Sequence, residues 1–480
     1  MENNIKNHQV INILKDLTKR PAFKLIIFAG LSLFWVVFMW NFWDKGPYAL
    51  GINAFVFLSL FIWTFISILR EKEHFSKSDW SWIIPLLLIA LSFLIYDNPF
   101  IKIINILVFP VLFAGFYNYA FLDNKEKRYW NPVFFLRILQ RIFSFFSKLL
   151  KSLMLYLEMI VPADKGKKGI VSKVIAGVGL FLLIALTVFI PLLSSADPAF
   201  ADKMGLINAW VKEIFSGPWA YKVIVFIILS VSMLSMSSAW GRKLDYEESG
   251  EDKKKIDPIV PGIVLGGILM LYLLFLWVQV SRLWVGSLPF DFKETESLVK
   301  SGFWQLLFLS MINIVIYFFT YRKTVPLVQW ILMAFTVASL LLLSSAGYRM
   351  GLYVVYYGFS YEKFFASYTV IYCLVLFIWL ISRLFIKKRS NIVKFLVMLF
   401  LWMYSVVTIL PIEQFIFRTN IQLSRISQSR IRLSEMRMLS PDVLALAEYY
   451  GSLGEPWVAE QKKNLADKKW YELNLMNIFK

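Results

Sequence analysis

Residues 325–345 read VPLVQWILMAFTVASLLLLSS, a predominantly apolar run without a charged side chain. A helix needs about 20 predominantly apolar residues to cross the hydrocarbon core of a bilayer, so this run is long enough to span a membrane. The apolar residues are continuous, whereas the strands of a transmembrane barrel alternate apolar and polar residues. The sequence therefore predicts an all-α membrane protein.

Ten further apolar runs flank this one along the chain. Hydrophobic residues make up 58% of the sequence and aromatic residues 18%, which is more apolar than soluble domains usually are. We therefore expect a polytopic integral membrane bundle of about eleven transmembrane helices. The predicted spans are 23–43, 47–69, 80–96, 100–121, 171–193, 219–240, 259–284, 302–321, 325–345, 364–385 and 391–411.

The basic residues alternate between connections. The chain has a formal net charge of +19, and the N-terminal segment with the even-numbered connections holds 27 Lys and Arg, against 7 in the odd-numbered ones. This positive-inside bias predicts a cytoplasmic N-terminus and an extracytoplasmic C-terminus. We interpret the basic excess as topology and attraction to anionic lipid headgroups, and we expect no nucleic-acid partner.

The longest predicted cytoplasmic connection contains an amphipathic helix at 133–152. Its basic side chains fall on one helical face, and apolar side chains fill the other. They are Arg137, Arg141, Lys148 and Lys151. We expect this helix to lie in the membrane plane with the basic face toward the headgroups. The alternative is that 142–161 forms a twelfth span, which its charged residues disfavour.

These features predict four parts. They are an N-terminal four-helix membrane bundle (1–121), a cytoplasmic connection with the in-plane amphipathic helix (122–170), a C-terminal seven-helix membrane bundle (171–411) and an extracytoplasmic helical tail (412–480). In the tail, apolar residues recur at helical spacing behind Ser440 and Pro441, residue types that begin helices. We therefore expect a small helical module there.

The predicted outward connection 346–363 reads AGYRMGLYVVYYGFSYEK. Within it, Arg349 is followed at helical spacing by Tyr353, Tyr356 and Tyr357. A guanidinium beside several phenols suits a sugar, phosphate or carboxylate headgroup. The alternative is an aromatic belt at headgroup depth, with the arginine extended toward the interface.

A second group of polar residues lies in the predicted connection after the fifth span. Asp197 and Asp202 are carboxylates that could coordinate a divalent cation. The alternative role for Asp197 is to cap a helix ahead of Pro198.

Arg418 and Asn420 follow the last span. Because Arg349 and Arg418 both lie just beyond the outer ends of predicted spans, we expect them to form one anionic site or a shared anchor for the tail. No catalytic or cofactor-binding motif is recognisable, and with two histidines and one cysteine no metal site or cofactor is expected. The sequence does not decide whether the protein is an enzyme, and we favour a non-enzymatic protein.

Several stretches resemble one bacterial membrane family. They are SSAGYRMGLYVVYYGFSYEKF (344–364), SADPAF (195–200), VKSGFWQLLFLSMIN (299–313), PIEQFIFRTNIQ (411–422) and MLSPDVLAL (438–446). They are similar to the hallmarks of the uncharacterised family known as domain of unknown function 4173, with its sister family 4153. The chain departs from the family pattern at Leu410-Pro411 and at Thr419. The resemblance implies a polytopic bacterial inner-membrane protein with no established activity.

Three functions fit these observations. The first is a non-enzymatic envelope protein that presents its outer loops and C-terminal tail to a protein partner or a lipid headgroup. The second is a transporter or channel for a small solute, and the third is a membrane enzyme acting on a lipid-linked substrate. A continuous polar cavity would favour transport, a lateral groove with clustered Arg and Asp would favour an enzyme, and a dry bundle would favour presentation.

Overall fold

The computed structural model is helical throughout the residues that it describes. These are 21–71, 74–121, 130, 133–160, 178, 218–240, 257–283, 292–321, 323–385, 391–426, 431, 439–450 and 455–478. They contain eight helices long and apolar enough to cross a membrane, or up to ten if each of two bent helix pairs counts as one span. The predicted all-α polytopic membrane fold is confirmed. The fifth predicted span, 171–193, lies outside the described residues.

The chain divides into two compact units. Unit 1 comprises 1–245 and 468–479, and unit 2 comprises 246–467. The predicted division at residues 121, 170 and 411 follows from membrane topology and stays a prediction, whereas the boundary between the units falls at residue 245.

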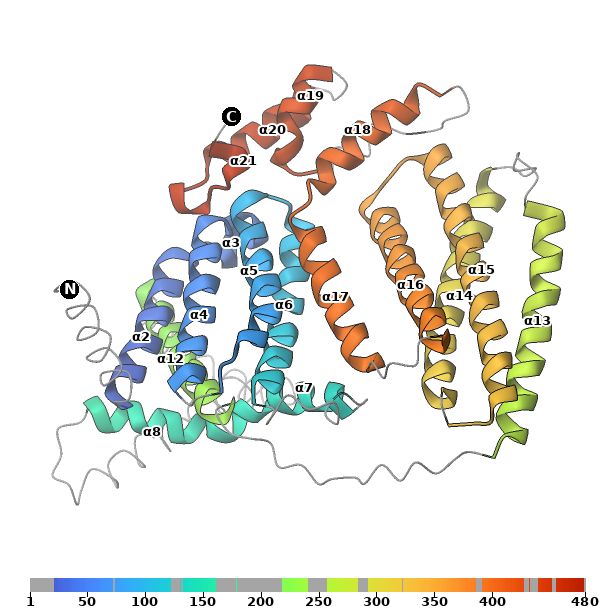
Figure 1. Ribbon diagram of the computed structural model, residues 1–480. Coiled ribbons are helices and arrows are strands. Elements are labelled where there is room, and N and C mark those ends of the chain that lie inside the picture. The colour runs from blue at the N-terminus through green and yellow to red at the C-terminus, as the bar shows by residue number, and fades with distance from the viewer. Residues whose placement is uncertain are drawn as a thin grey trace, which may run out of the picture. The chain divides into compact units, whose positions relative to one another are not determined.

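Unit 1 is a bundle crossed at one end by two helices (Figure 1). Its elements are α2 (Pro21–Phe38), α3 (Phe42–Lys45), η1 (Gly46–Ala49), α4 (Ile52–Glu71), η2 (Lys77–Asp79), α5 (Trp80–Ile95), α6 (Pro99–Ala120), α7 (Val133–Ser144), η5 (Phe145–Lys148), α8 (Leu149–Ile160), α12 (Pro218–Trp240), η9 (Trp470–Glu472) and α21 (Leu475–Ile478). Helix α12 packs against α2, although almost 180 residues of sequence separate them.

Aromatic rings form the centre of unit 1. Phe65 of α4, Phe113 and Tyr117 of α6 and Trp240 of α12 have ring centroids 5.4–6.3 Å apart. The Tyr117 hydroxyl donates to the backbone carbonyl of Phe65 at 2.9 Å. A buried phenol needs such a partner, so the polar end of the cluster is satisfied within the bundle.

Helices α7 and α8 run across the ends of the unit 1 bundle (Figure 1), and the predicted helix therefore exists. The predicted orientation of Arg141 toward headgroups is wrong, because its side chain is buried with 2% exposure. Its guanidinium donates to Oδ1 of Asn118 and to the Trp240 carbonyl, and the Trp240 indole donates back to the Arg141 carbonyl. Burial lowers the pKa of Arg141 to about 10, so it remains charged at neutral pH.

The exposed face of this helical segment is apolar. Leu136, Leu139, Phe143, Phe146 and Leu150 recur at intervals of three and four residues, and all are exposed. An apolar row on a helix that crosses the end of a bundle suits insertion at the acyl-chain boundary. The in-plane placement stays a prediction.

Unit 2 is arranged around one long helix, α15 (Pro326–Tyr357), which packs against α13, α14 and α16. The other elements are α13 (Ile259–Leu283), α14 (Phe292–Thr320), α16 (Tyr361–Phe385), α17 (Ile392–Thr408), α18 (Ile412–Ser424), η8 (Pro441–Val443), α19 (Leu444–Tyr450) and α20 (Glu455–Ala466). Asn313 of α14 bridges two neighbours, because its amide donates to the Ser339 hydroxyl at 2.9 Å and accepts from the Tyr272 hydroxyl at 2.7 Å. The amide therefore joins three helices.

The predicted outward connection 346–363 is mostly helical. Helix α15 continues to Tyr357. Ala346, Met350 and Val354, at intervals of four residues, are buried and extend the packed face of the helix beyond residue 345. The helix ends at Gly358, whose φ of +69° is a left-handed conformation that favours glycine. Only 358–360 connect α15 to α16, so the predicted 18-residue loop is wrong.

The last predicted span breaks after Thr408. Helices α17 and α18 meet at an angle of 70° around Pro411, a residue that cannot continue a helix interior. Beyond α18, the described residues 439–450 and 455–466 form short helices that share an apolar core with α18. This core includes Phe417 and Ile421 of α18 with Val443, Ala447 and Trp457. We call residues 439–466 the C-terminal module. The described part of the tail is thus helical in η8, α19 and α20, and its place outside the cytoplasm stays a prediction.

Candidate functional site

The turn between α15 and α16 is held by Asn420 of α18. The Asn420 amide accepts from the Phe359 N–H at 2.6 Å and donates to the Phe359 carbonyl at 2.9 Å. These two bonds fix the backbone of a residue 61 positions earlier in the chain. Asn420, a predicted ligand-binding residue, is buried, and its amide oxygen and nitrogen are both used within unit 2.

Glu413 connects the same region to the C-terminal module. Its carboxylate is buried and accepts hydrogen bonds from the Tyr361 hydroxyl and from the N–H and hydroxyl of Ser440. Buried carboxylates need several such donors. We define the signature cluster as Gly358, Phe359, Tyr361, Glu413, Asn420 and Ser440. It joins α15, α16, α18 and η8.

Tyr353 and Tyr357, two of the tyrosines predicted to bind a ligand, contact the ammonium group of Lys363. The Lys363 ammonium lies 4.4 Å from the ring centroid of Tyr353 and 5.9 Å from that of Tyr357. It also donates to the carbonyls of Tyr357 and Gly358 at 3.1 and 2.8 Å. A cation at a helix C-terminus satisfies the last carbonyls and the helix dipole. These two rings thus serve a cation–π contact, which the sequence analysis did not predict.

The remaining residues predicted to bind a ligand make none of the contacts of the signature cluster that are described above. Arg349 is half-buried in α15, and its Nε has no hydrogen-bond partner among the described residues. The Tyr356 ring contacts that of Tyr357, and Arg418 is exposed on α18. Asp197 and Asp202 lie outside the described residues. A shared site of Arg349 and Arg418 stays a prediction.

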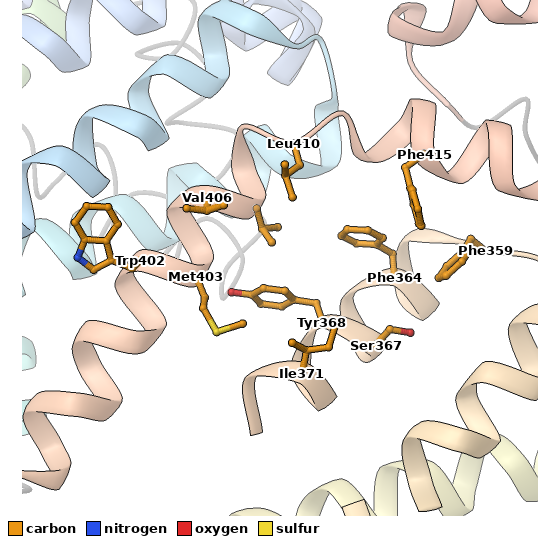
Figure 2. Close-up of a pocket in the computed structure, with 11 residues that line it drawn as sticks. Phe359, Phe364, Ser367, Tyr368, Ile371, Trp402, Met403, Val406, Leu410 and Phe415 are labelled. Carbon is orange, nitrogen blue, oxygen red and sulfur yellow. The ribbon is translucent and has the colours of Figure 1, made fainter. Parts of the chain in front are cut away.

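Beside the signature cluster lies a cavity of about 510 Å³ between α16 and α17. Its walls are almost entirely apolar, and Phe359 and Phe415 close one end with their rings 5.3 Å apart. Figure 2 shows the Tyr368 hydroxyl pointing into the space between the two helices. A second cavity of about 320 Å³, between α13 and α15, has only apolar side chains in its walls.

Unit 1 contains a buried charged network that was not predicted from the sequence. Asp97, between α5 and α6, accepts from Lys102 at 2.7 Å and from Lys468. All three side chains are at most 2% exposed. Asn474 of the same C-terminal segment donates to the carbonyls of Phe93 and Tyr96 at 2.7 and 2.6 Å. A lysine within a predicted span, close to an aspartate at its start, is the signal that could have identified this network.

Gly51 allows the C-terminal segment to approach α4 closely. A Cβ at this position would contact the backbone of Glu472 and Leu473, and the Ile52 N–H donates to the Leu473 carbonyl at 3.1 Å. Residues 468–479 are therefore part of the fold of unit 1, held by main-chain and charged contacts.

The described residues include no group of three or more His, Cys, Asp or Glu placed to hold a metal ion. The single cysteine, Cys373, is buried in α16. The signature cluster consists of hydrogen bonds that fix backbone and carboxylate groups, so its chemistry is that of a structural anchor.

The fold and composition define a multi-pass helical membrane protein. The family model for Domain of unknown function (DUF4153) matches residues 83–449, so the chain belongs to that family. The sequence resemblance was assigned to family 4173, with 4153 given only as its sister, whereas the family model that matches is that of 4153. No match was found among curated proteins or among solved structures.

Proposed function

We propose that this protein is a non-enzymatic membrane protein that presents its C-terminal module to a protein partner outside the cytoplasm. The observation that carries this proposal is the buried Glu413 carboxylate, which ties Ser440 at the start of the module to Tyr361 of α16. A module fixed in this way loses little conformational freedom on binding, which favours association.

The interior of unit 2 supports presentation over transport. The cavities between α16 and α17 and between α13 and α15, both within the described residues, have apolar walls, whereas a solute path needs polar groups along its length. The Asn313 amide is bonded to Ser339 and Tyr272, and the Gln329 amide donates to the Thr320 carbonyl and the Thr324 hydroxyl. These span amides hold neighbouring groups together.

The proposal requires the module to face outward in a bacterial inner membrane. We expect an impermeant thiol reagent to label Ser452→Cys in intact cells and to label Ser249→Cys only after lysis, both in a Cys373→Ser background. This follows from the 27-to-7 distribution of basic residues between alternate connections. Labelling of position 249 in intact cells with protection of 452 would overturn the orientation.

Site-specific photo-crosslinking tests presentation directly. A photoreactive residue at Glu460 or Lys463, both exposed on α20, should give one discrete adduct with an envelope protein in cells. The same residue at Lys77, exposed in the predicted cytoplasmic connection, is the matched control and should not give that adduct. Glu413→Gln removes the carboxylate charge that holds Ser440 and should reduce the adduct while the protein remains in the membrane. Equal adducts at positions 77 and 463 would contradict the proposal.

A further inference from the structure

The cavity between α16 and α17 has the size and walls of a site for a small apolar ligand. Its volume of about 510 Å³ lies within the range of about 300–1,000 Å³ that is usual for ligand sites. Apolar side chains from both helices line it, together with Phe359 and Phe415 at the end near the signature cluster. A long hydrocarbon chain would fit against these apolar walls.

One polar atom in this cavity lacks a partner. The Tyr368 hydroxyl is buried and has no hydrogen bond to any of the described residues, and it points into the space between the helices (Figure 2). A buried phenol normally finds an acceptor. The ligand should therefore carry an acceptor oxygen next to its apolar part.

The position of Tyr368 along α16 indicates where that acceptor lies. Helix α16 has 25 residues from Tyr361 to Phe385, which at about 1.5 Å per residue matches the thickness of a bilayer with part of its headgroup layers. Tyr368 lies two turns from the first residue of the helix. Its Cα is therefore about 10 Å from that end of the helix, in the outer part of the hydrocarbon layer, within reach of the ester of a lipid whose acyl chain enters the cavity.

The cavity is continuous with the outer surface of the helices. Ile371 is 53% exposed, Val406 41% and Leu410 45%, and all three line the cavity. In a membrane-spanning helix such exposed apolar side chains are covered by lipid. A bilayer lipid is therefore the molecule that can reach the cavity directly from the surface that it already covers.

We propose that the cavity between α16 and α17 binds one acyl chain of an ester-linked glycerolipid, with the Tyr368 hydroxyl donating a hydrogen bond to the ester carbonyl. This inference concerns a lipid inside unit 2 and not the partner of the C-terminal module. Each can therefore fail without the other.

Photolabelling of the full-length protein tests the site. The protein is placed in vesicles of phosphatidylethanolamine and phosphatidylglycerol that contain a phosphatidylglycerol with a diazirine in one acyl chain. Irradiation followed by peptide mass spectrometry should place the label on the cavity walls, in 364–371 and 402–410. Ile371→Trp should fill the cavity and reduce this labelling to background.

Ile378→Trp is the matched control. Ile378 lies seven residues further along the same face of α16, is 58% exposed and does not line the cavity. It should therefore leave labelling of the cavity walls unchanged. Val406→Trp fills the cavity from α17 and replaces Ile371→Trp if that variant does not fold. Equal labelling in the position 378 variant and in both cavity variants would mean ordinary surface lipid and overturn the proposal.

The hydroxyl is tested by comparing ester and ether lipids. Tyr368→Phe should weaken retention of the ester-linked phosphatidylglycerol by about two- to tenfold, the effect of one hydrogen bond, as measured by native mass spectrometry. The dialkyl ether analogue lacks the carbonyl and should bind the wild type and the variant equally. The same loss for both lipids would overturn the assignment of the acceptor.

Discussion

Replacing Asp97 by alanine should lower the free energy of unfolding by about 3–5 kcal/mol, the usual effect of removing one partner from a buried ion pair. The variant leaves the ammonium groups of Lys102 and Lys468 buried without their shared carboxylate. Lys102 would retain only the Leu50 carbonyl among the hydrogen bonds identified for its ammonium. Denaturant titration of the protein in detergent, followed by aromatic fluorescence, measures the change.

Asp44→Ala is the matched control for this prediction. Asp44 is exposed on α3 of the same unit, so its loss should change stability by no more than about 0.5 kcal/mol. An Asp97→Ala, Lys468→Met double variant also removes one of the two buried ammonium groups that lack a carboxylate partner. It should therefore be more stable than Asp97→Ala alone. A loss below about 1 kcal/mol for Asp97→Ala would mean that the network does not hold residues 468–479 in unit 1.

The same network shows what apolar periodicity can and cannot predict. A long apolar run specifies a spanning helix, because the bilayer requires each backbone group to bond within the helix, and described helices occupy ten of the eleven predicted spans. The predicted span 100–121 includes Lys102 without marking it as a special position, because one lysine hardly changes the mean hydropathy of such a run. The second partner of Asp97, Lys468, is 371 residues further along the chain, a pairing that no local pattern contains.

Arg141 shows the same limit for helix faces. Periodicity predicts a helix at 133–152, but it does not say which side chains meet the protein. Phe134, Ile138 and Arg141 are buried together, whereas Leu136 and Leu139 are exposed. The basic side chains were predicted to meet the headgroups, whereas the Arg141 guanidinium donates to the Asn118 amide and the Trp240 carbonyl inside unit 1. Partners from α6 and α12 become visible only once the helices are packed.

The candidate site was found in part through the family resemblance. The resemblance drew attention to Asn420 and Ser440, yet their partners, Phe359 and Glu413, lie 61 and 27 residues away. The predicted loop around Arg349 failed for a different reason, because the buried positions of α15 continue at helical spacing beyond 345. The first residue that ends the helix is Gly358.

Gly358→Ala should therefore lower the free energy of unfolding by at least about 2 kcal/mol. An alanine at φ +69° is strained, and its Cβ would lie 2.7 Å from Oδ1 of Asn420, the atom that accepts from the Phe359 N–H. The substitution should thus disturb the backbone conformation and the Asn420 clamp together. Thermal unfolding and denaturant titration in detergent measure the loss.

Gly351→Ala, in the same helix, separates this effect from a general intolerance of side chains. Nothing lies within 4 Å of a Cβ at position 351, and alanine is the better helix former, so stability should stay constant or rise by up to about 1 kcal/mol. If the clash with Asn420 contributes, Gly358→Ala combined with Asn420→Ala should cost less than the sum of the two single variants. If the stability losses of Gly358→Ala and Asn420→Ala add fully, backbone strain at Gly358 is the sole cause of the first loss. If Gly358→Ala and Gly351→Ala change stability equally, Gly358 does not have the assigned role in ending α15. Because Phe359 lines the cavity between α16 and α17, loss of the clamp should also release one wall of the proposed lipid site.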